Sequence, residues 1–346
     1  MTGKDNVTHR GAITGAALGA LGVLGFSLSL PATRVAVEHL DPWFVAFGRA
    51  VGAGLLAVAY LVAVRAPRPS PAQWRRLAVV AAGVVAGFPM FTSLALRSST
   101  AAHGAVVIAL LPAVTAGFAV LRARERPTPA FWLAGAAGLA AVLVFLGLSG
   151  TVAGAVGPAD LFLLAAVALC GLGYAEGGAL SRELGGARTI CWALVLALPF
   201  TIAVTAAAAV HRPPHAPAAA WSGFAYLTVV SMFLGFFAWY GGLARGGVAR
   251  VGQIQLAQPV LTLAWSAALL HEHVAPAALV AALAVLACVA LTQRLRAPAA
   301  ERPAPGAISS SGGRVPVRPG APGGVHPAAR DSARDNGLHA DRFRRR

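Results

Sequence analysis

Two ionisable side chains lie inside long apolar runs, where a charge is costly. Arg49 falls in the run at residues 43–64, and Glu176 falls in the run at residues 159–180. A charged side chain at the centre of a membrane helix costs about 2.5 to 3.5 kcal/mol on insertion scales. Such residues usually face a cavity or a partner, so both are candidates for binding or coupling chemistry.

Each of these two residues has two interpretations. Arg49 can attract the carboxylate of an anionic or zwitterionic substrate, or its long side chain can reach headgroups or carbonyls of neighbouring helices. Glu176 can carry a coupling proton, or it can pair with Arg182 or meet cytoplasmic water. Its neighbours are small residues that let another helix approach closely, namely Gly173, Gly177 and Gly178.

A polar stripe follows in the run at residues 248–270. Gln255, Gln258 and Thr262 are spaced by three and four positions, so they share one face of a helix. Pro259 removes a backbone hydrogen bond and can open carbonyls toward a cavity. The stripe is a candidate substrate-binding wall; the alternative is interhelical packing through amide hydrogen bonds, worth about 0.6 to 2 kcal/mol each.

Aromatic residues divide by their depth in the apolar runs. Tyr174 lies deep in its run and is a further candidate for the substrate cavity. The others lie near the ends of runs and predict an aromatic belt at the membrane interfaces, namely Trp43, Trp74, Trp221, Trp239 and Tyr240.

The composition fixes the broad class of the protein. Of its 346 residues, 57% are hydrophobic and 12% are charged, which is too few charges for a soluble surface. The net charge of +16 does not predict a nucleic-acid partner, because basic residues gather in alternate loops of a membrane protein for topological reasons. The expected partners are the lipid bilayer and a small-molecule substrate, and the sequence predicts no particular oligomeric state.

Signatures of enzymes and metal sites are missing from the sequence. All three cysteines lie in apolar runs, and no Cys/His spacing suits zinc. Neither a G-x-S-x-G motif, a Walker loop nor an H-E-x-x-H motif occurs. We therefore expect no catalytic residues, no metal, no cofactor and no enzymatic activity.

About ten apolar runs are long enough to cross a membrane, and they contain a repeat. Pro112 and Pro259 are separated by 147 positions, as are Glu125 and Glu272. In each copy a proline interrupts an apolar run and the glutamate follows it, which indicates an internal duplication. We expect the prolines to break their helices and the glutamates to fix loops or helix ends. The offset covers five helices, an odd number, so the copies have inverted topology.

The loop charges orient the chain. Arg65, Arg68 and Arg122 lie on the Arg-rich side, whereas Arg34, Arg97 and Arg212 stand alone on the other, which places both termini in the cytoplasm. The expected order is a cytoplasmic N-terminus, a first five-helix repeat, an external linker, a second repeat and a basic tail predicted to be disordered. These segments span residues 1–11, 12–149, 150–158, 159–293 and 294–346.

Four stretches carry a family resemblance: DPWFVAFGRA, ALRSSTAAHGAVVIALLPAVTA, RERPTPAFWLAG and QLAQPVLTLAWSAALLHEHVAP. In this arrangement they resemble the drug/metabolite transporter superfamily, in its branch with two EamA-type domains. The first helix departs from that pattern, because it lacks the family's usual Trp and Asn.

The resemblance implies an all-α integral membrane protein with ten helices in two inverted repeats. It also implies a secondary active transporter of small organic metabolites, such as amino-acid-like compounds, or of drugs. Transport across a bacterial inner membrane would proceed by alternating access, often as export, with coupling to a proton or by exchange. The alternatives are a polytopic membrane enzyme acting on lipid-linked substrates and a non-transporting scaffold, and the inverted repeat favours the transporter.

Overall fold

The computed structural model describes residues 3–123, 128–149, 157–246, 251 and 254–295. The chain divides into two units, Met1–Ala299 and Ala300–Arg346, and the second lies wholly outside the described residues. The predicted disorder of the tail and the role expected of Glu125 therefore also lie outside them.

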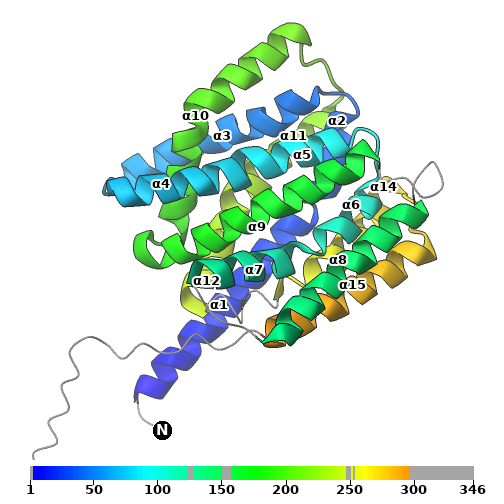
Figure 1. Cartoon of the computed structure of the whole chain (residues 1–346). Helices are drawn as coiled ribbons and strands as arrows, with labels where there is room; N and C mark the ends of the chain where they lie inside the picture. Colours follow the sequence, from blue (N-terminus) through cyan, green and yellow to red (C-terminus); the bar gives the residue numbers. More distant parts are fainter. Residues whose placement is uncertain (1–2, 124–127, 150–156, 247–250, 252–253, 296–346) are drawn as a thin grey trace, which may run out of the picture. The chain divides into compact units, whose positions relative to one another are not determined.

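All regular structure in the described part of the chain is helical (Figure 1). The first part comprises α1 (Gly3–Ser27), α2 (Ser29–Val37), α3 (Pro42–Ala63), α4 (Pro71–Val80), η1 (Ala81–Gly87), α5 (Phe88–Ala95), α6 (Ala101–Ile108), α7 (Leu111–Ala123) and α8 (Pro129–Ser149). The second comprises α9 (Pro158–Leu184), α10 (Gly186–His211), α11 (Ala218–Tyr226), η2 (Leu227–Leu234), α12 (Gly235–Gly246), α14 (Ala257–Leu270) and α15 (Pro276–Leu295).

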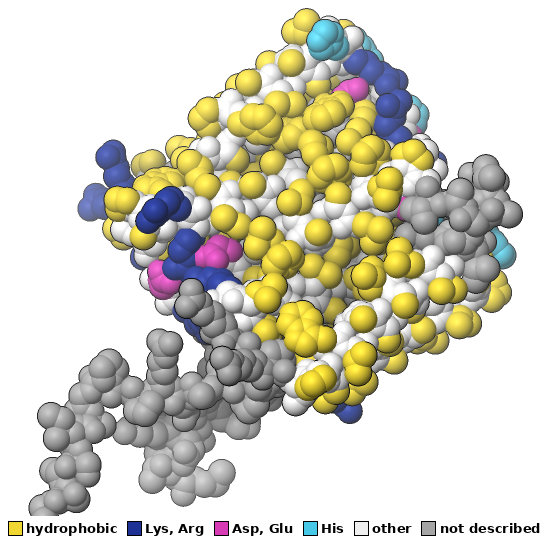
Figure 2. All heavy atoms as spheres, in the orientation of Figure 1, with side chains coloured by type: hydrophobic (Ala, Val, Ile, Leu, Met, Phe, Trp, Pro, Cys, Tyr) yellow, Lys and Arg dark blue, Asp and Glu magenta, His cyan; other side chains and the backbone are white. Residues whose placement is uncertain are grey.

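Seven helical segments of the described chain are long and apolar enough to cross a membrane. They are Ile13–Val37, Pro42–Ala63, Pro71–Ala95, Ala101–Arg122, Pro158–Leu184, Gly186–His211 and Ala218–Arg245. Three shorter apolar helices accompany them, over Pro129–Phe145, Ala257–Leu270 and Pro276–Leu291. On the face shown in Figure 2, apolar side chains predominate and charged groups gather toward its margins, as expected for a surface that meets lipid.

Local sequence sets where several helices begin. Pro42, with its fixed φ, opens α3, and the Asp41 carboxylate accepts hydrogen bonds from the backbone N–H groups of Trp43 and Phe44 at 2.8 and 3.3 Å. Ser70 and Gln73 form a reciprocal capping box around the start of α4. These caps satisfy N–H groups that would otherwise be unpaired at the edge of an apolar layer.

Two spans change from α- to π-helix partway along. η1 ends at Gly87 and η2 ends at Leu234, positions 147 residues apart, which is also the spacing of the two prolines. Turns also interrupt two further segments, at Ala109–Leu110 just before Pro112 and at residues 255–256 just before Pro259. The prolines were expected to break their helices, but the π segments were not anticipated.

Close helix packing depends on glycine at several crossings. α1 lies against α12, and a Cβ atom added at Gly242 would come within 2.7 Å of the Gly19 backbone nitrogen and 2.9 Å of the Gly15 carbonyl oxygen. α3 packs on α10 and α8 packs on α15, pairs that lie side by side in Figure 1. Each of the last two pairs joins residues 12–149 to residues 159–293.

The α1–α12 crossing predicts that Gly242→Ala destabilises the protein, because the added methyl group meets backbone atoms that cannot rotate away. We expect a loss of about 1 to 3 kcal/mol in the free energy of unfolding, measured by denaturation of the purified protein in detergent. Gly117→Ala in α7 is the matched control, since no described atom outside the neighbouring backbone lies within 4 Å of a Cβ placed there. Equal stability of the two variants would contradict this account of the crossing.

Candidate functional site

A cavity of about 30 Å³ lies where the interrupted helices meet, with room for about one water molecule. Three of the five predicted substrate-binding residues line this cavity: Arg49 from α3, Tyr174 from α9 and Gln258 from α14. The other lining residues are Phe26, Ser29, Leu30, Val84, Phe88, Leu111, Cys170, Ser231, Met232 and Phe236. Residues from both expected repeats therefore form one central site.

Among the described residues that line the cavity, Arg49 is the one that carries a charge, and it is 2% exposed. Among the described residues, no hydrogen bond or ion pair joins its guanidinium to another group, and its Nε atom is buried without an acceptor. An arginine stays ionised in proteins, and an unpaired buried charge costs several kcal/mol. Arg49 neither reaches the surface nor bonds a described carbonyl, so its charge is directed at the cavity without compensation.

The two copies of the broken helix contribute different chemistry to the cavity. Leu111 immediately precedes Pro112, and Gln258 immediately precedes Pro259; both line the cavity at equivalent positions of the repeat. The Gln258 Oε1 atom is buried and accepts no hydrogen bond from the described part of the chain. One side of the cavity is thus apolar and the other offers an amide.

The rest of the polar stripe lies away from the cavity. The Thr262 hydroxyl donates a hydrogen bond to the Ser27 carbonyl at 2.8 Å, and Trp265 Nε1 donates to the Ser27 hydroxyl at 3.0 Å. Gln255 is buried, and neither it nor Thr262 lines the cavity. Thr262 therefore holds α14 against α1, which is the packing role considered as the alternative for the stripe.

Aromatic rings close one part of the cavity wall. The Tyr174 ring lies 6.0 Å from Phe236 and 5.9 Å from Trp239, measured between centroids. Trp239 and Tyr240 are fully buried, so their prediction as members of an interfacial belt is wrong. The reason is packing between helices: a Cβ atom added at Gly22 of α1 would lie 2.9 Å from the Trp239 backbone nitrogen, and one added at Gly177 of α9 would clash with the Tyr240 side chain.

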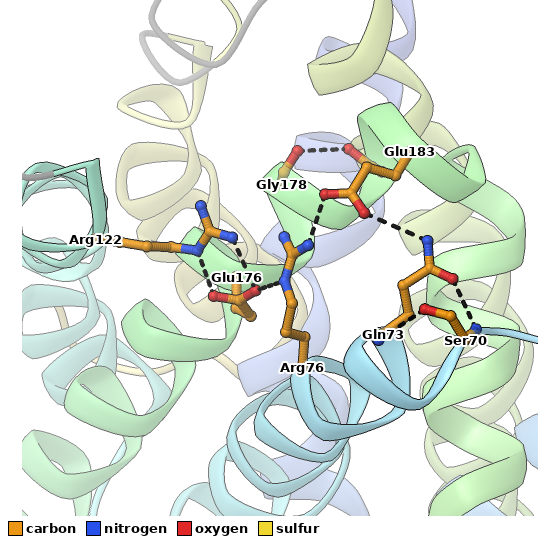
Figure 3. Close-up of polar contacts among 8 residues, drawn as sticks. Ser70, Gln73, Arg76, Arg122, Glu176, Gly178 and Glu183 are labelled. Atoms are coloured by element: carbon orange, nitrogen blue, oxygen red, sulfur yellow. Dashed lines mark hydrogen bonds and ion pairs between the residues drawn. The ribbon is translucent and has the colours of Figure 1, made fainter.

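Glu176 joins three helices at one end of α9 (Figure 3). Its carboxylate accepts a hydrogen bond from Arg122 Nε of α7 at 2.5 Å and another from Arg76 Nε of α4. Arg76 Nη1 also pairs with Glu183 at 2.6 Å, and Gln73 Nε2 donates to the same carboxylate at 3.3 Å. We call Gln73, Arg76, Arg122, Glu176 and Glu183 the Glu176 cluster.

The Glu176 cluster corrects and extends the sequence-based expectation. The arginines paired with Glu176 are Arg76 and Arg122, rather than Arg182. Arg122 is interpreted from the sequence as a topological charge and no pairing role is predicted for Arg76, and nothing in the sequence shows that α4 and α7 converge on α9. The convergence depends in part on Gly173, where an added Cβ would lie 2.7 Å from the Val84 side chain of η1.

A second set of polar contacts lies toward the other end of α9. The Glu272 carboxylate accepts hydrogen bonds from the backbone N–H groups of Ala101 and Ala102 at 2.9 and 2.8 Å, which places a negative charge on the N-terminus of α6. His103 Nε2 lies 2.7 Å from Asp160 Oδ1. Because Asp160 and Glu176 are ~24 Å apart along α9 at about 1.5 Å per residue, these contacts are remote from the Glu176 cluster. We call them the Glu272 contacts.

The described residues contain no group of three or more His, Cys, Asp and Glu side chains that could hold a metal ion. The described residues that line the central cavity supply one guanidinium, one amide, one phenol, two serine hydroxyls and the Cys170 thiol. Such a site can bind and orient a small molecule.

The geometry predicts strong coupling between Glu176 and Arg122, because the side chain of Glu176 is only 13% exposed. A double-mutant cycle on unfolding free energy should give about 1 to 2 kcal/mol for this charge-assisted pair. The pair Arg34–Glu38, at 3.3 Å and four positions apart on one helical stretch, is the control: its carboxylate is 44% exposed, so it should give about 0.3 to 0.5 kcal/mol. Coupling no larger than the control would contradict the interhelical role of Glu176.

Comparison with known proteins places the chain in a family. The profile of the EamA-like transporter family matches residues 13–147 and again residues 157–294. The chain is 45% identical over 276 residues to a Bacillus subtilis (strain 168) protein named "Uncharacterized transporter YdeK", covering 80% of this chain and 96% of that protein. A solved structure described as "Crystal structure of protein" has a TM-score of 0.56 at 22% identity, over 82% of this chain and 99% of the other, and shows similarity of fold. The chain belongs to the EamA-like transporter family and is a multi-pass membrane transporter of small molecules.

Proposed function

We propose that the protein is a secondary active transporter that exports small organic metabolites, such as amino-acid-like compounds, or drugs across the bacterial inner membrane. The observation that carries this proposal is the central cavity, where Arg49, Tyr174 and Gln258 converge from helices distant in sequence. A binding site surrounded by helices that meet near the middle of the layer is typical of secondary transporters.

We further propose that the chain forms ten helices in two inverted five-helix repeats, at residues 12–149 and 159–293, with residues 150–158 as an external linker. Two separate matches to the family profile support this arrangement. So does the recurrence of a π segment and of a proline after 147 residues. The pairing of α3 with α10 and of α8 with α15 joins equivalent helices, as a two-fold relation would require. The loop charges support cytoplasmic termini.

Two sets of polar contacts support a mechanism of alternating access. In this proposal the Glu176 cluster closes the cytoplasmic end of the cavity, because it ties α4 and α7 to α9. The Glu272 contacts close the outer end by holding the loop before α15 to the start of α6. Each transport cycle breaks one set while the other persists, so the cavity meets one side of the membrane at a time.

Glu176 is also the proposed site of proton coupling. A proton on this carboxylate removes the negative charge that holds Arg76 and Arg122, which frees α4 and α7 from α9. Proton binding and opening of the cytoplasmic end are then one event. This mechanism applies if the driving force is a proton gradient; exchange of solutes needs no such step.

The proposal is tested by counterflow in proteoliposomes with a panel of radiolabelled amino acids, other metabolites and drugs, because counterflow needs no assumed driving force. Protein-dependent accumulation of at least one solute is expected, with protein-free liposomes as the control. No flux and no ligand-induced stabilisation across the panel would contradict transport and favour a scaffold.

The unequal polarity of the cavity predicts where selectivity resides. Gln258→Ala should change the ratio of counterflow rates among solutes by about tenfold or more, because it removes an unpaired buried amide from the wall. Leu111→Ala, at the equivalent position of the first repeat, should change all the rates by a similar factor. The ratios are measured with two solutes competing in one vesicle preparation, and a larger shift of the ratio in Leu111→Ala would contradict the prediction.

Proton coupling predicts a separation of two activities in Glu176→Gln. This variant should lose transport driven by an imposed pH gradient and retain counterflow exchange, since the amide cannot gain or lose the coupling proton. Glu183→Gln serves as the control, because Glu183 is 44% exposed and belongs to the outer part of the cluster. Undiminished gradient-driven transport by Glu176→Gln would rule Glu176 out as the proton site.

A further inference from the structure

We infer that the central cavity selects monoanionic solutes whose charged group is a carboxylate, and that Arg49 is the residue that binds this group. The inference rests on the proposed function, because it names the charge class of the transported solute. Arg49 contacts the charged group of the solute, and the apolar part of the cavity wall contacts the rest of the molecule.

The charge balance of the cavity is the first step. Arg49 contributes the one formal charge among the described lining residues, and the described acid nearest in sequence to Tyr174, Glu176, is engaged by Arg76 and Arg122. A buried cation without a partner raises the free energy of the folded protein, and binding of an anionic ligand removes this penalty. A cationic ligand would add a second positive charge to the same enclosed space.

The number and shape of the polar groups favour a carboxylate. One guanidinium balances one negative charge, whereas a phosphate dianion would bring an unmatched charge into a wall that is otherwise uncharged. The planar fork of a guanidinium matches the two oxygens of a carboxylate. Ser29 and Ser231 hydrogen-bond to each other at 2.7 Å across the cavity wall, so the amide of Gln258 is the more available second contact. Its unpaired Oε1 atom only accepts, so the amide must turn its Nε2 group toward the carboxylate to donate a hydrogen bond.

The rest of the wall suits an apolar body on the solute. Phe26, Phe88, Met232 and Phe236 surround the polar groups, and Leu111 faces them from α7. The cavity volume of about 30 Å³ is far below that of an organic acid, so binding must separate the helices. The contact between the solute and Arg49 then favours the state in which the helices are separated. An anion shifts the protein toward this open state more strongly than a neutral solute of the same shape.

The experiment compares four probes that share one apolar body: 3-phenylpropionate, its neutral amide, 3-phenylpropylamine and 3-phenylpropyl phosphate. Binding to the purified full-length protein is measured by calorimetry, and flux of each probe is measured by counterflow. We expect 3-phenylpropionate to bind most tightly, and Arg49→Gln to weaken its binding by about 30-fold or more while leaving the neutral amide within about threefold.

Two further variants separate the effect of the Arg49 charge from the effect of its guanidinium shape and of net charge. Arg49→Lys retains the charge and loses the fork, so it should bind 3-phenylpropionate less tightly than the wild type while still preferring it to the amide. Arg212→Gln makes the same change of net charge at an exposed position beyond α10 and should bind all four probes like the wild type. If Arg49→Gln does not fold, the affinities of the wild type and of Arg49→Lys for the four probes are compared instead.

The outcomes separate this inference from the proposed function. Tighter binding of the amine, the amide or the phosphate, or undiminished carboxylate binding by Arg49→Gln, overturns the inference, and so does failure of all four probes to bind. Transport of other solutes in the panel would leave the proposed function standing in each of those cases. Carboxylate binding through Arg49 without flux of any solute would uphold the inference and contradict transport.

Discussion

The cost of placing charge in an apolar layer governs how this molecule is organised. Only 12% of the residues are charged, so each charged side chain inside a span must be matched or must serve a ligand. Glu176 is matched twice, by Arg76 and by Arg122. Arg49 is matched by no described group. Glu176 therefore belongs to the contacts proposed to close the cavity, whereas Arg49 is the residue proposed to bind an anion inside it.

Backbone irregularity supplies the geometry in which those charges act. Val84 lies in η1 and Ser231 lies in η2, and both line the cavity, so the two π segments pass directly beside the site. π segments are rare and frequently occur at functional sites, because they leave backbone groups less regularly paired and shift the side chains that follow. The breaks before Pro112 and Pro259 bring Leu111 and Gln258 to the same cavity. Four irregular segments thus surround a site that regular helices would fill with packed side chains.

Sequence reasoning reached the helical membrane class and the family, because long apolar runs and repeated prolines depend on local composition and spacing. It also selected Arg49, Tyr174 and Gln258, since an ionisable or polar side chain inside an apolar run is conspicuous. It did not pair Glu176 with Arg76 and Arg122, because those contacts join residues about 100 and 54 positions away. It misplaced Trp239 and Tyr240 because their burial depends on the facing helices α1 and α9, which the spacing within their own span does not reveal. Interhelical register, which decides both points, leaves no mark in the spacing of residues along one helix.

The central claim is that the two ends of the cavity open in alternation. Pulsed electron–electron double resonance between spin labels can test it, with one pair at Arg75 and Leu121, adjacent in sequence to Arg76 and Arg122, and another at Ser98 and Ala275, three residues from Ala101 and Glu272. All four positions are exposed, whereas Cys170 and Cys191 are buried; Cys288 is half-buried and is replaced by Ala before labelling. Compared with the same labelled protein carrying Glu176, Glu176→Gln should lengthen the first distance without lengthening the second. Lengthening of both distances together, or no change in the first, would contradict alternating access controlled by Glu176.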